Sequence, residues 1–323
     1  MAFAAASGAR IRDTRIWAVS AVRVTTRGVR LDSRAPLLLL PLALGCRPAR
    51  AEDQQVPSPS ASVAPVPPPT ASAAVTPASP AAPAPAGPCP PEMSRVGKAC
   101  VDRWEAHLVL ASEPARVHPH NQRPDKGVSY AARSSSGVFP QAYVNRIEAR
   151  AACEAAGKRL CTLGEWYRAC RGDKGATWPY GWHEKRTACN VMKPHLLGKL
   201  FGNDPRRWDY AKHFNAPELN TTPGGLAKTA EHAECTNAAG TFDMVGNVHE
   251  WVSDVVDASL EQKLPLRDDI RKKIGVNTGH GIFMGGFYST GDEHGKGCGF
   301  VTIGHEPKYH DYSTGFRCCK DSG

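Results

Sequence analysis

The pattern of apolar and polar positions begins with one short apolar run near the N-terminus. Residues 35–45 are rich in leucine and end at Cys46, whereas residues 1–28 show neither a helical nor a strand period. A run of about eleven apolar residues is too short to span a membrane as a helix but suits the hydrophobic region of a signal segment. We therefore expect residues 1–46 to direct export.

The end of this run resembles a lipobox. Gly45 precedes Cys46 and Leu42 lies upstream, so a peptidase can cleave before a cysteine whose thiol receives a lipid. Several acyl chains on one residue anchor a protein stably. We predict lipidation at Cys46 and a place in the cell envelope, on the periplasmic or outer-membrane face, with membrane contact through the lipid anchor only. The upstream segment is long, and we predict that translation starts at Val24 or Val29.

Residues 47–88 form a segment in which apolar periodicity is lost. From Val56 to about Pro91 the chain contains almost only Pro, Ala, Ser, Val and Thr, with no aromatic and no charged residue. Nothing in it can offset the entropy of ordering the backbone. We expect an extended spacer of roughly 100 Å. A ligand for proline-reading domains is the alternative interpretation.

Residues 89–323 regain aromatic residues, glycine turns and mixed charge, and we expect one folded domain there. Asn145 with Glu148 three positions later predicts a capped helix that stops at Gly157. Thr162 and Glu165 repeat the capping-box pattern before Trp166. The rest is rich in turn residues with few long periodic runs, which predicts an irregular α+β fold.

Charge and cysteine content then narrow the class of protein. Residues 1–50 contain nine Arg and two Asp, and so carry +7 of the formal charge of +9. The near-neutral remainder gives no field for nucleic acid, and we expect no nucleic-acid partner. Leaving Cys46 aside, ten cysteines remain, and up to five disulfides in an oxidising compartment account for them. Reduced core thiols in a cytosolic protein are the alternative.

Six short motifs occur in order along the folded region. They are G-K-R-L-C-T-L-G-E-W at 157–166, W-P-Y-G at 178–181, A-C-N at 188–190, F-D-M-V-G-N-V-H-E-W at 242–251, M-G-G-F at 284–287 and G-F-R at 315–317. Together they resemble the motifs of the formylglycine-generating enzyme, or sulfatase-modifying factor, family, in a bacterial lipoprotein branch. The resemblance implies a compact C-type-lectin-like α+β fold with little regular secondary structure.

The resemblance also implies two disulfides. It pairs the cysteine of the first helix with the one after G-F-R, and the cysteine that closes the second helix with one in the last loop. Adjacent Cys318 and Cys319 would form a strained bridge with each other, so Cys319 needs another partner. The remaining three pairs follow only from the cysteines left over. The expected pairs are Cys153–Cys318, Cys170–Cys298, Cys161–Cys319, Cys89–Cys100 and Cys189–Cys235.

Metal sites are implied in the same way. Asp243, Gly246, Val248 and Glu250 resemble a family calcium site, where carboxylates bracket a tight glycine turn. The alternative is that Glu250 only hydrogen-bonds or caps the turn. Asn190 and Val191 match part of a second family metal site. That site also needs an acidic residue further along the chain, and the downstream segment here departs from the family pattern. We expect structural calcium.

Copper chemistry is not expected. The aerobic family enzyme uses a pair of cysteines shortly after the Gly-Gly element, and their thiolates bind copper(I). The corresponding positions here are Thr290 and Gly295, and the nearby Cys298 is assigned to a disulfide. A lone cysteine cannot make a two-thiolate site, so we expect no formylglycine-generating activity.

Histidines offer another chemistry for the same pocket. His249 stands where the family pattern has tryptophan, and the final loop is rich in histidine; imidazoles with a carboxylate can hold iron. Surface histidines without a role are the alternative interpretation. The pocket candidates are His249, Thr290, His305 and His310, with His294, Asp311 and Tyr312 nearby in the sequence.

Three functions follow from these observations. The first is a non-catalytic domain on a spacer that binds a protein, peptide or glycan through the former active-site cleft. The second is a metal-dependent oxidase or protein-modifying enzyme that acts on exported proteins. The third is a purely structural envelope protein.

Overall fold

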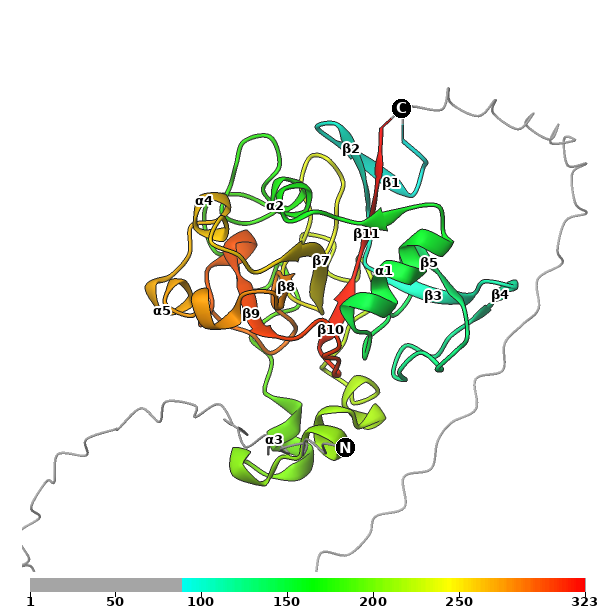
Figure 1. Ribbon diagram of the computed structural model, residues 1–323, viewed down its shortest axis with the longest axis vertical. Helices are drawn as coiled ribbons and strands as arrows, with labels where there is room; N and C mark the ends of the chain where they lie inside the picture. The colour runs from blue at the N-terminus through cyan, green and yellow to red at the C-terminus, as the bar shows by residue number, and fades with distance from the viewer. Residues whose placement is uncertain (1–88, 323) are drawn as a thin grey trace, which may run out of the picture. The chain divides into compact units, whose positions relative to one another are not determined.

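A computed structural model describes residues 89–322 (Figure 1). The predicted signal segment, Cys46 and the linker 47–88 lie outside the described residues. None of the helices found between residues 89 and 322 has the length and apolar character needed to cross a bilayer.

Three small sheets form the framework of the domain. One has the strand order β1-β2-β11-β6, a second the order β10-β7-β8-β9, and the third the order β4-β3-β5. Only β10 and β7 pair in parallel within these sheets. The strands are β1 (Met93–Val96), β2 (Ala99–Asp102), β3 (Ala106–Leu110), β4 (Glu113–Val117), β5 (Tyr130–Ser134), β6 (Arg159–Leu160), β7 (His249–Val255), β8 (Gly281–Met284), β9 (Val301–His305), β10 (Thr314–Phe316) and β11 (Cys318–Asp321).

The helices are short and few. Two of them, α1 and α2, pack against the sheets, and the segment that contains α3 extends from the body of the domain (Figure 1). The helices are α1 (Arg146–Ala155), α2 (Leu163–Arg171), α3 (Leu196–Phe201), α4 (Leu260–Lys263) and α5 (Asp268–Arg271), with the single turns η1 (Pro205–Arg207), η2 (Tyr210–Phe214), η3 (Pro217–Asn220), η4 (Gly275–Asn277) and η5 (Gly297–Gly299).

Both predicted helix starts are confirmed. The Asn145 side chain accepts hydrogen bonds from the backbone N–H groups of Ile147 and Glu148, and the Glu148 carboxylate accepts from the Asn145 N–H. Thr162 and Glu165 form the same reciprocal pair at the start of α2. Because each box satisfies donors that no helical carbonyl reaches, the chain turns sharply into each helix.

The core lies between these helices and the β7-β8-β9 part of the second sheet. α2 buries Leu163, Trp166 and Ala169 against Val252 and Met284, and α1 buries Ala149 and Ala152 in a second cluster with Trp251 and Phe283. Much of the remaining chain is turn and loop. The predicted α+β fold with little regular secondary structure is therefore confirmed.

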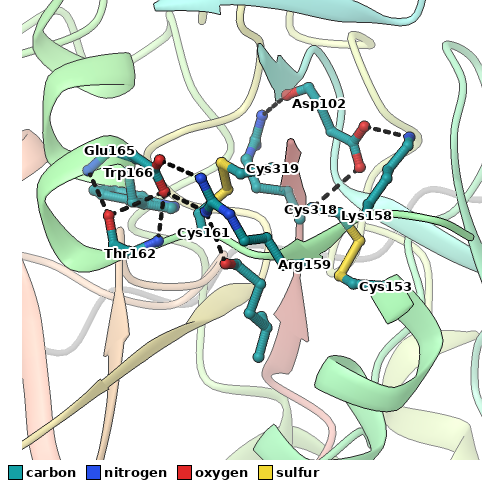
Figure 2. Close-up of a disulfide and its surroundings, with 12 residues drawn as sticks. Asp102, Cys153, Lys158, Arg159, Cys161, Thr162, Glu165, Trp166, Cys318 and Cys319 are labelled. Atoms are coloured by element: carbon teal, nitrogen blue, oxygen red, sulfur yellow. Dashed lines mark hydrogen bonds and ion pairs between the residues drawn. A yellow bond between two sulfur atoms is a disulfide. The ribbon is translucent and has the colours of Figure 1, made fainter. Parts of the chain in front are cut away.

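Five disulfides staple this loop-rich domain, and they join the same pairs that the sequence analysis expects. Figure 2 shows two of them side by side where β11 lies next to β6, with Asp102 and Lys158 beside them. The Lys158 ammonium lies 2.6 Å from the Asp102 carboxylate, whose second oxygen accepts from the Cys318 N–H. The bridges are Cys89–Cys100, Cys153–Cys318, Cys161–Cys319, Cys170–Cys298 and Cys189–Cys235.

Candidate functional site

The predicted calcium turn, residues 243–250, folds against the segment predicted to form the second metal site. Asn190 Nδ2 donates to the Asn247 side-chain oxygen at 2.9 Å, and the Asn190 carbonyl accepts from the Asn247 N–H. Gly246 has a φ of +83°, and a Cβ there would collide with the Asn190 carbonyl. Only glycine allows this close approach. The structure therefore brings Asn190 and the turn together from distant parts of the sequence.

A carboxylate that the sequence analysis missed supports this turn. The fully buried Glu105 accepts a hydrogen bond from Asn247 Nδ2 at 2.6 Å and another from the Val248 N–H at 3.2 Å. Glu105 immediately precedes β3. The only sequence signal for its role is that a charged residue stands beside an apolar strand. The two bonds of Glu105 hold the Asn247 side chain and the Val248 N–H of the turn.

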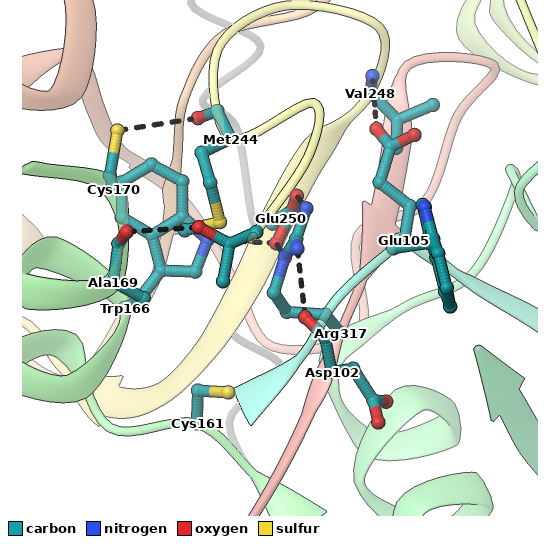
Figure 3. A network of polar contacts seen from close by, with 12 residues as sticks. Asp102, Glu105, Cys161, Trp166, Ala169, Cys170, Met244, Val248, Glu250 and Arg317 are labelled. Atoms are coloured by element: carbon teal, nitrogen blue, oxygen red, sulfur yellow. Dashed lines mark hydrogen bonds and ion pairs between the residues drawn. The ribbon is translucent and has the colours of Figure 1, made fainter. Parts of the chain in front are cut away.

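Glu250 has a partner other than a metal ion. The guanidinium of Arg317 donates to both Glu250 oxygens, at 2.6 and 2.7 Å, and Trp166 Nε1 donates to one of them at 2.8 Å (Figure 3). Arg317 also donates to three backbone carbonyls, so that all its N–H groups have acceptors. Of the two roles considered for Glu250, hydrogen bonding is the one seen here.

The network around Arg317 carries more carboxylates than cations. Burial raises the pKa of Asp243 to about 7, although the Ala230 N–H donates to that carboxylate. Burial raises the pKa of Glu105 well above its usual range, and the negative charges of Asp243 and Glu250 add to the effect. Arg317 thus holds together a buried acidic cluster that is poorly solvated.

The predicted calcium ligands have protein partners in the described structure. Both Glu250 oxygens accept hydrogen bonds from Arg317, the Asp243 carboxylate accepts from the Ala230 N–H, and Val191 is a half-buried packing residue. Within residues 89–322 no group of three or more His, Cys, Asp or Glu side chains could hold a metal ion. The backbone carbonyls of Gly246 and Val248 are not part of such a group, and calcium binding stays a prediction.

The histidine candidates separate into two places. His249 is buried against the rings of Phe283 and Phe287, at centroid distances of 4.6 and 5.2 Å, and its Nδ1 has no hydrogen-bond partner. Burial lowers the pKa of His249 well below its usual value, and nearby His294 and His305 lower it further. These three histidines lie in one apolar region of the second sheet.

The final-loop candidates have other partners. His310 Nδ1 lies 2.7 Å from the Asn215 side-chain oxygen. The Asp311 carboxylate accepts from Ser313 and Tyr309, and His195 Nε2 lies 3.2 Å from the Tyr312 hydroxyl. Asp311 and His310 are thus engaged away from the cluster of His249, His294 and His305, and iron binding stays a prediction.

Acid should destabilise the domain through His305. Burial lowers the pKa of His305 to about 4, whereas an unfolded histidine titrates near about 6.5. Protonation therefore favours the unfolded chain, so this contribution to stability is complete above about pH 6.5 and is lost as the pH falls toward 4. We expect His305→Gln to reduce the drop in unfolding free energy between pH 7 and pH 4.5 by about 2 kcal/mol.

Urea titrations at both pH values measure this difference. The raised pKa values of Glu105 and Asp243 act in the opposite direction, but they are common to both proteins and cancel in the comparison. The exposed His183 gives the control, and His183→Gln should leave the pH dependence unchanged. An equal pH dependence in wild type and His305→Gln would contradict the assignment.

The positions of the missing cysteine pair are closed. Thr290 is buried, and its hydroxyl donates to the Phe287 carbonyl at 2.8 Å. Gly295 has a φ of +128°, and a Cβ there would strike the Gly299 carbonyl. The cavity beside Thr290, lined also by Trp178 and Met192, has a volume of about 20 Å³, room for about one water molecule. All ten cysteines of the described residues are in disulfides, so no thiolate is left there for copper.

Residues 93–322 match the Sulfatase-modifying factor enzyme 1-like domain family. The chain belongs to this family. The sulfatase-modifying factor domain thus accounts for almost all of the described residues, as the six motifs predict.

Curated relatives resemble part of this family domain. The "Inactive C-alpha-formylglycine-generating enzyme 2" of Bos taurus is 27% identical over 190 residues, which is 57% of this chain and 51% of that protein. The "Formylglycine-generating enzyme" of Streptomyces coelicolor is 26% identical over 189 residues, 57% of this chain and 53% of that protein. The "Formylglycine-generating enzyme" of Mus musculus is 31% identical over 42% of this chain and 31% of its own length. The matches thus span about half or less of each relative.

Solved structures give weaker likenesses. CarF aligns with a TM-score of 0.41 at 15% identity, covering 69% of this chain and 86% of that chain. PvdO from Pseudomonas aeruginosa aligns with a TM-score of 0.38 at 13% identity, covering 69% of this chain and 80% of that chain.

Proposed function

We propose that this chain is an exported, lipid-anchored member of the sulfatase-modifying factor family whose domain binds a ligand and does not form formylglycine. The observation that carries the proposal is that the cysteines of the described domain form disulfides and leave no thiol there for copper. The ten cysteines between residues 89 and 319 are all cross-linked, and Thr290 and Gly295 stand where the resemblance implies the copper-binding pair.

Two further observations support a binding role. The cavity at Thr290 leaves room for about one water molecule, which is too small for a peptide cysteine to enter. The relative from Bos taurus, which matches as much of this chain as the Streptomyces coelicolor enzyme does, is itself named an inactive enzyme. Disulfides persist in oxidising compartments outside the cytosol. The five bridges therefore agree with export through the signal segment, lipidation at Cys46 and display on the spacer 47–88.

A metal-dependent oxidase is the second candidate. It is favoured by the unpartnered Nδ1 of the buried His249 and by the neighbouring imidazoles of His294 and His305. Such a site needs a rearrangement or further ligands, because no three His, Cys, Asp or Glu side chains of residues 89–322 lie where they could hold one metal ion.

The test uses the full chain purified from the membrane fraction of an expressing bacterium. Thiol titration of the folded protein is expected to find no reactive cysteine, and incubation with copper(I), dioxygen and a cysteine-containing peptide is expected to leave the peptide unchanged by mass spectrometry. The mouse formylglycine-generating enzyme serves as the positive control. Two reactive thiols, or conversion of the peptide, would overturn the proposal.

Metal analysis of the same preparation separates the two candidates. Calcium alone, or no metal, agrees with a binding module. One equivalent of iron or copper per chain that is lost in His249→Ala and His305→Ala would favour the oxidase instead.

A further inference from the structure

A second concavity, separate from the closed cavity at Thr290, lies at the C-terminal end of α2. Its volume is about 660 Å³, within the range of about 300–1,000 Å³ usual for ligand sites. Three segments that are distant in the sequence form its walls: the end of β1, the stretch 168–182 that runs from the end of α2 through two turns, and the turn 236–239. We call it the basic hollow.

Cations predominate among the residues that line the basic hollow. Arg95, Arg168, Arg171 and Lys174 face a single acidic residue, Asp173. No ion pair joins any of these four cations to a carboxylate in the part of the chain that the structure describes. The dipole of α2 favours basic residues in its last turn, but this accounts only for the two arginines of the helix.

Arg95 and Arg168 converge on one turn. Arg95 Nε donates to the Gly97 carbonyl at 3.5 Å, and a Cβ built on Gly97, where φ is +61°, would lie 2.6 Å from Arg168 Nη1. Both guanidinium groups therefore lie at the turn that contains Gly97. Neither is paired with a carboxylate there, so an anion bound at this turn would meet two cations.

Arg171 is held in place rather than extended into solvent. Its guanidinium donates to the carbonyls of Gly175 and Ala176 and lies over the Tyr167 ring, 4.9 Å from the centroid. A cation fixed in this way loses little entropy when it meets a ligand.

Aromatic rings lie beside these cations. Trp182 lines the basic hollow with 58% of its surface exposed, and within residues 89–322 its ring stacks on no other ring or cation. Tyr180, at the same rim, stacks on Trp178 at a centroid distance of 5.8 Å. A large exposed indole beside unpaired arginines offers an apolar surface and charged donors together, as a binding site does.

The excess of positive charge belongs to the basic hollow itself. An adjoining concavity of about 390 Å³ shares Arg171 with it, but its Lys296 and Arg267 are balanced by Asp292 and by Asp269, which pairs with Arg267. Four cations spread over one open concavity suit a polymer with repeated negative charges better than one small anion. The five disulfides point to an oxidising compartment, which favours an acidic polysaccharide over nucleic acid as that polymer.

We propose that the basic hollow binds an acidic polysaccharide, with Arg95 and Arg168 on its carboxylate or sulfate groups and Trp182 stacked on a sugar ring. This inference rests on the proposed binding role and names its site and ligand class. It places the ligand at the end of α2 and not in the former active-site cleft beside Thr290.

Binding of the full chain to immobilised polygalacturonate, dextran sulfate and neutral dextran tests the proposal. We expect binding to the two acidic polymers that weakens with added salt, and no binding to dextran. The double variant Arg95→Gln/Arg168→Gln should weaken binding at least about tenfold, since losing even one hydrogen bond between charged groups has an effect of about that size. Trp182→Ala should weaken it about tenfold, because ring stacking is of similar size.

Arg116→Gln is the matched control, because Arg116 lies on the exposed β4 strand outside the basic hollow. It removes the same kind of charge and should change the affinity less than about twofold, as exposed charges outside a contact contribute little. Urea midpoints of all variants establish that they are folded; if the double variant is unfolded, Trp182→Ala and Lys174→Gln carry the test.

Three results would overturn the proposal: an equal loss in Arg116→Gln, equal binding to neutral dextran, or tighter binding to single-stranded DNA than to either acidic polysaccharide. Absence of binding to every polymer, with the cysteine peptide still unconverted, would overturn this inference and leave the proposed function standing. Conversion of the peptide would overturn the proposed function itself.

Discussion

Replacing Arg317 by methionine should lower the free energy of unfolding by about 3–5 kcal/mol. Arg317 has 0% and Glu250 1% of its side chain exposed, so the variant leaves a carboxylate buried without its cation. Glu105 and Asp243 lie in the same network, and their repulsion with Glu250 is then no longer offset. Such a loss is a large part of the stability of a domain, which is usually about 5–15 kcal/mol.

Urea unfolding with the disulfides intact measures this effect. Arg150→Met is the control, because Arg150 pairs with Glu154 on the exposed face of α1 and should contribute less than about 1 kcal/mol. The double variant Arg317→Met/Glu250→Met should recover part of the loss, since a buried ion pair replaced by apolar groups is often neutral. A loss below about 1 kcal/mol in Arg317→Met would contradict the importance of this ion pair.

Two disulfides end at the neighbouring residues Cys318 and Cys319. Removing one of them should destabilise the domain by less than the number of residues between its two cysteines indicates. Cys153–Cys318 spans 165 residues, a loop worth about 5 kcal/mol by the chain-entropy relation if it were alone. Cys161–Cys319 closes almost the same loop. When that bridge is present, Cys153–Cys318 closes only a further loop of about ten residues. We therefore expect a loss of about 3 kcal/mol for Cys153→Ala/Cys318→Ala.

Loss of both bridges should have a larger effect. The Cys170–Cys298 bridge then remains, and the second removal opens a loop of roughly 30 residues. The unfolding free energy should therefore fall by about 6 kcal/mol or more in total. Urea unfolding of the single-bridge and double-bridge variants, with the remaining bridges verified by mass spectrometry, gives the comparison. A loss of about 5 kcal/mol in Cys153→Ala/Cys318→Ala, the value for an isolated loop, would contradict the sharing of one loop by the two bridges.

These two predictions concern the scaffold that holds the turn 243–250. The same scaffold holds all ten cysteines of residues 89–322 in cross-links and binds the Glu250 carboxylate to Arg317. Arg95 and Arg168, which pair with no carboxylate of the described residues, lie instead around the basic hollow with the exposed Trp182. We expect ligand binding to depend on that surface.

The sequence by itself determined the features that depend on neighbours a few residues apart. The capping boxes at Asn145 and Thr162 each join positions three residues apart, and both form as predicted. The motifs identified the family and the α+β fold. The adjacency of Cys318 and Cys319 was enough to show that they need separate partners.

The tertiary structure alone decided what depends on distant partners. The resemblance places Glu250 in a calcium site, and only the fold shows its partner Arg317, which lies 67 residues away. Glu105 reaches Asn247 across 142 residues, and no local pattern indicates that contact. The basic hollow likewise needs three segments to come together. Caps are fixed by backbone geometry within one turn, whereas the partner of a buried charge is fixed by which side chains the completed fold encloses with it.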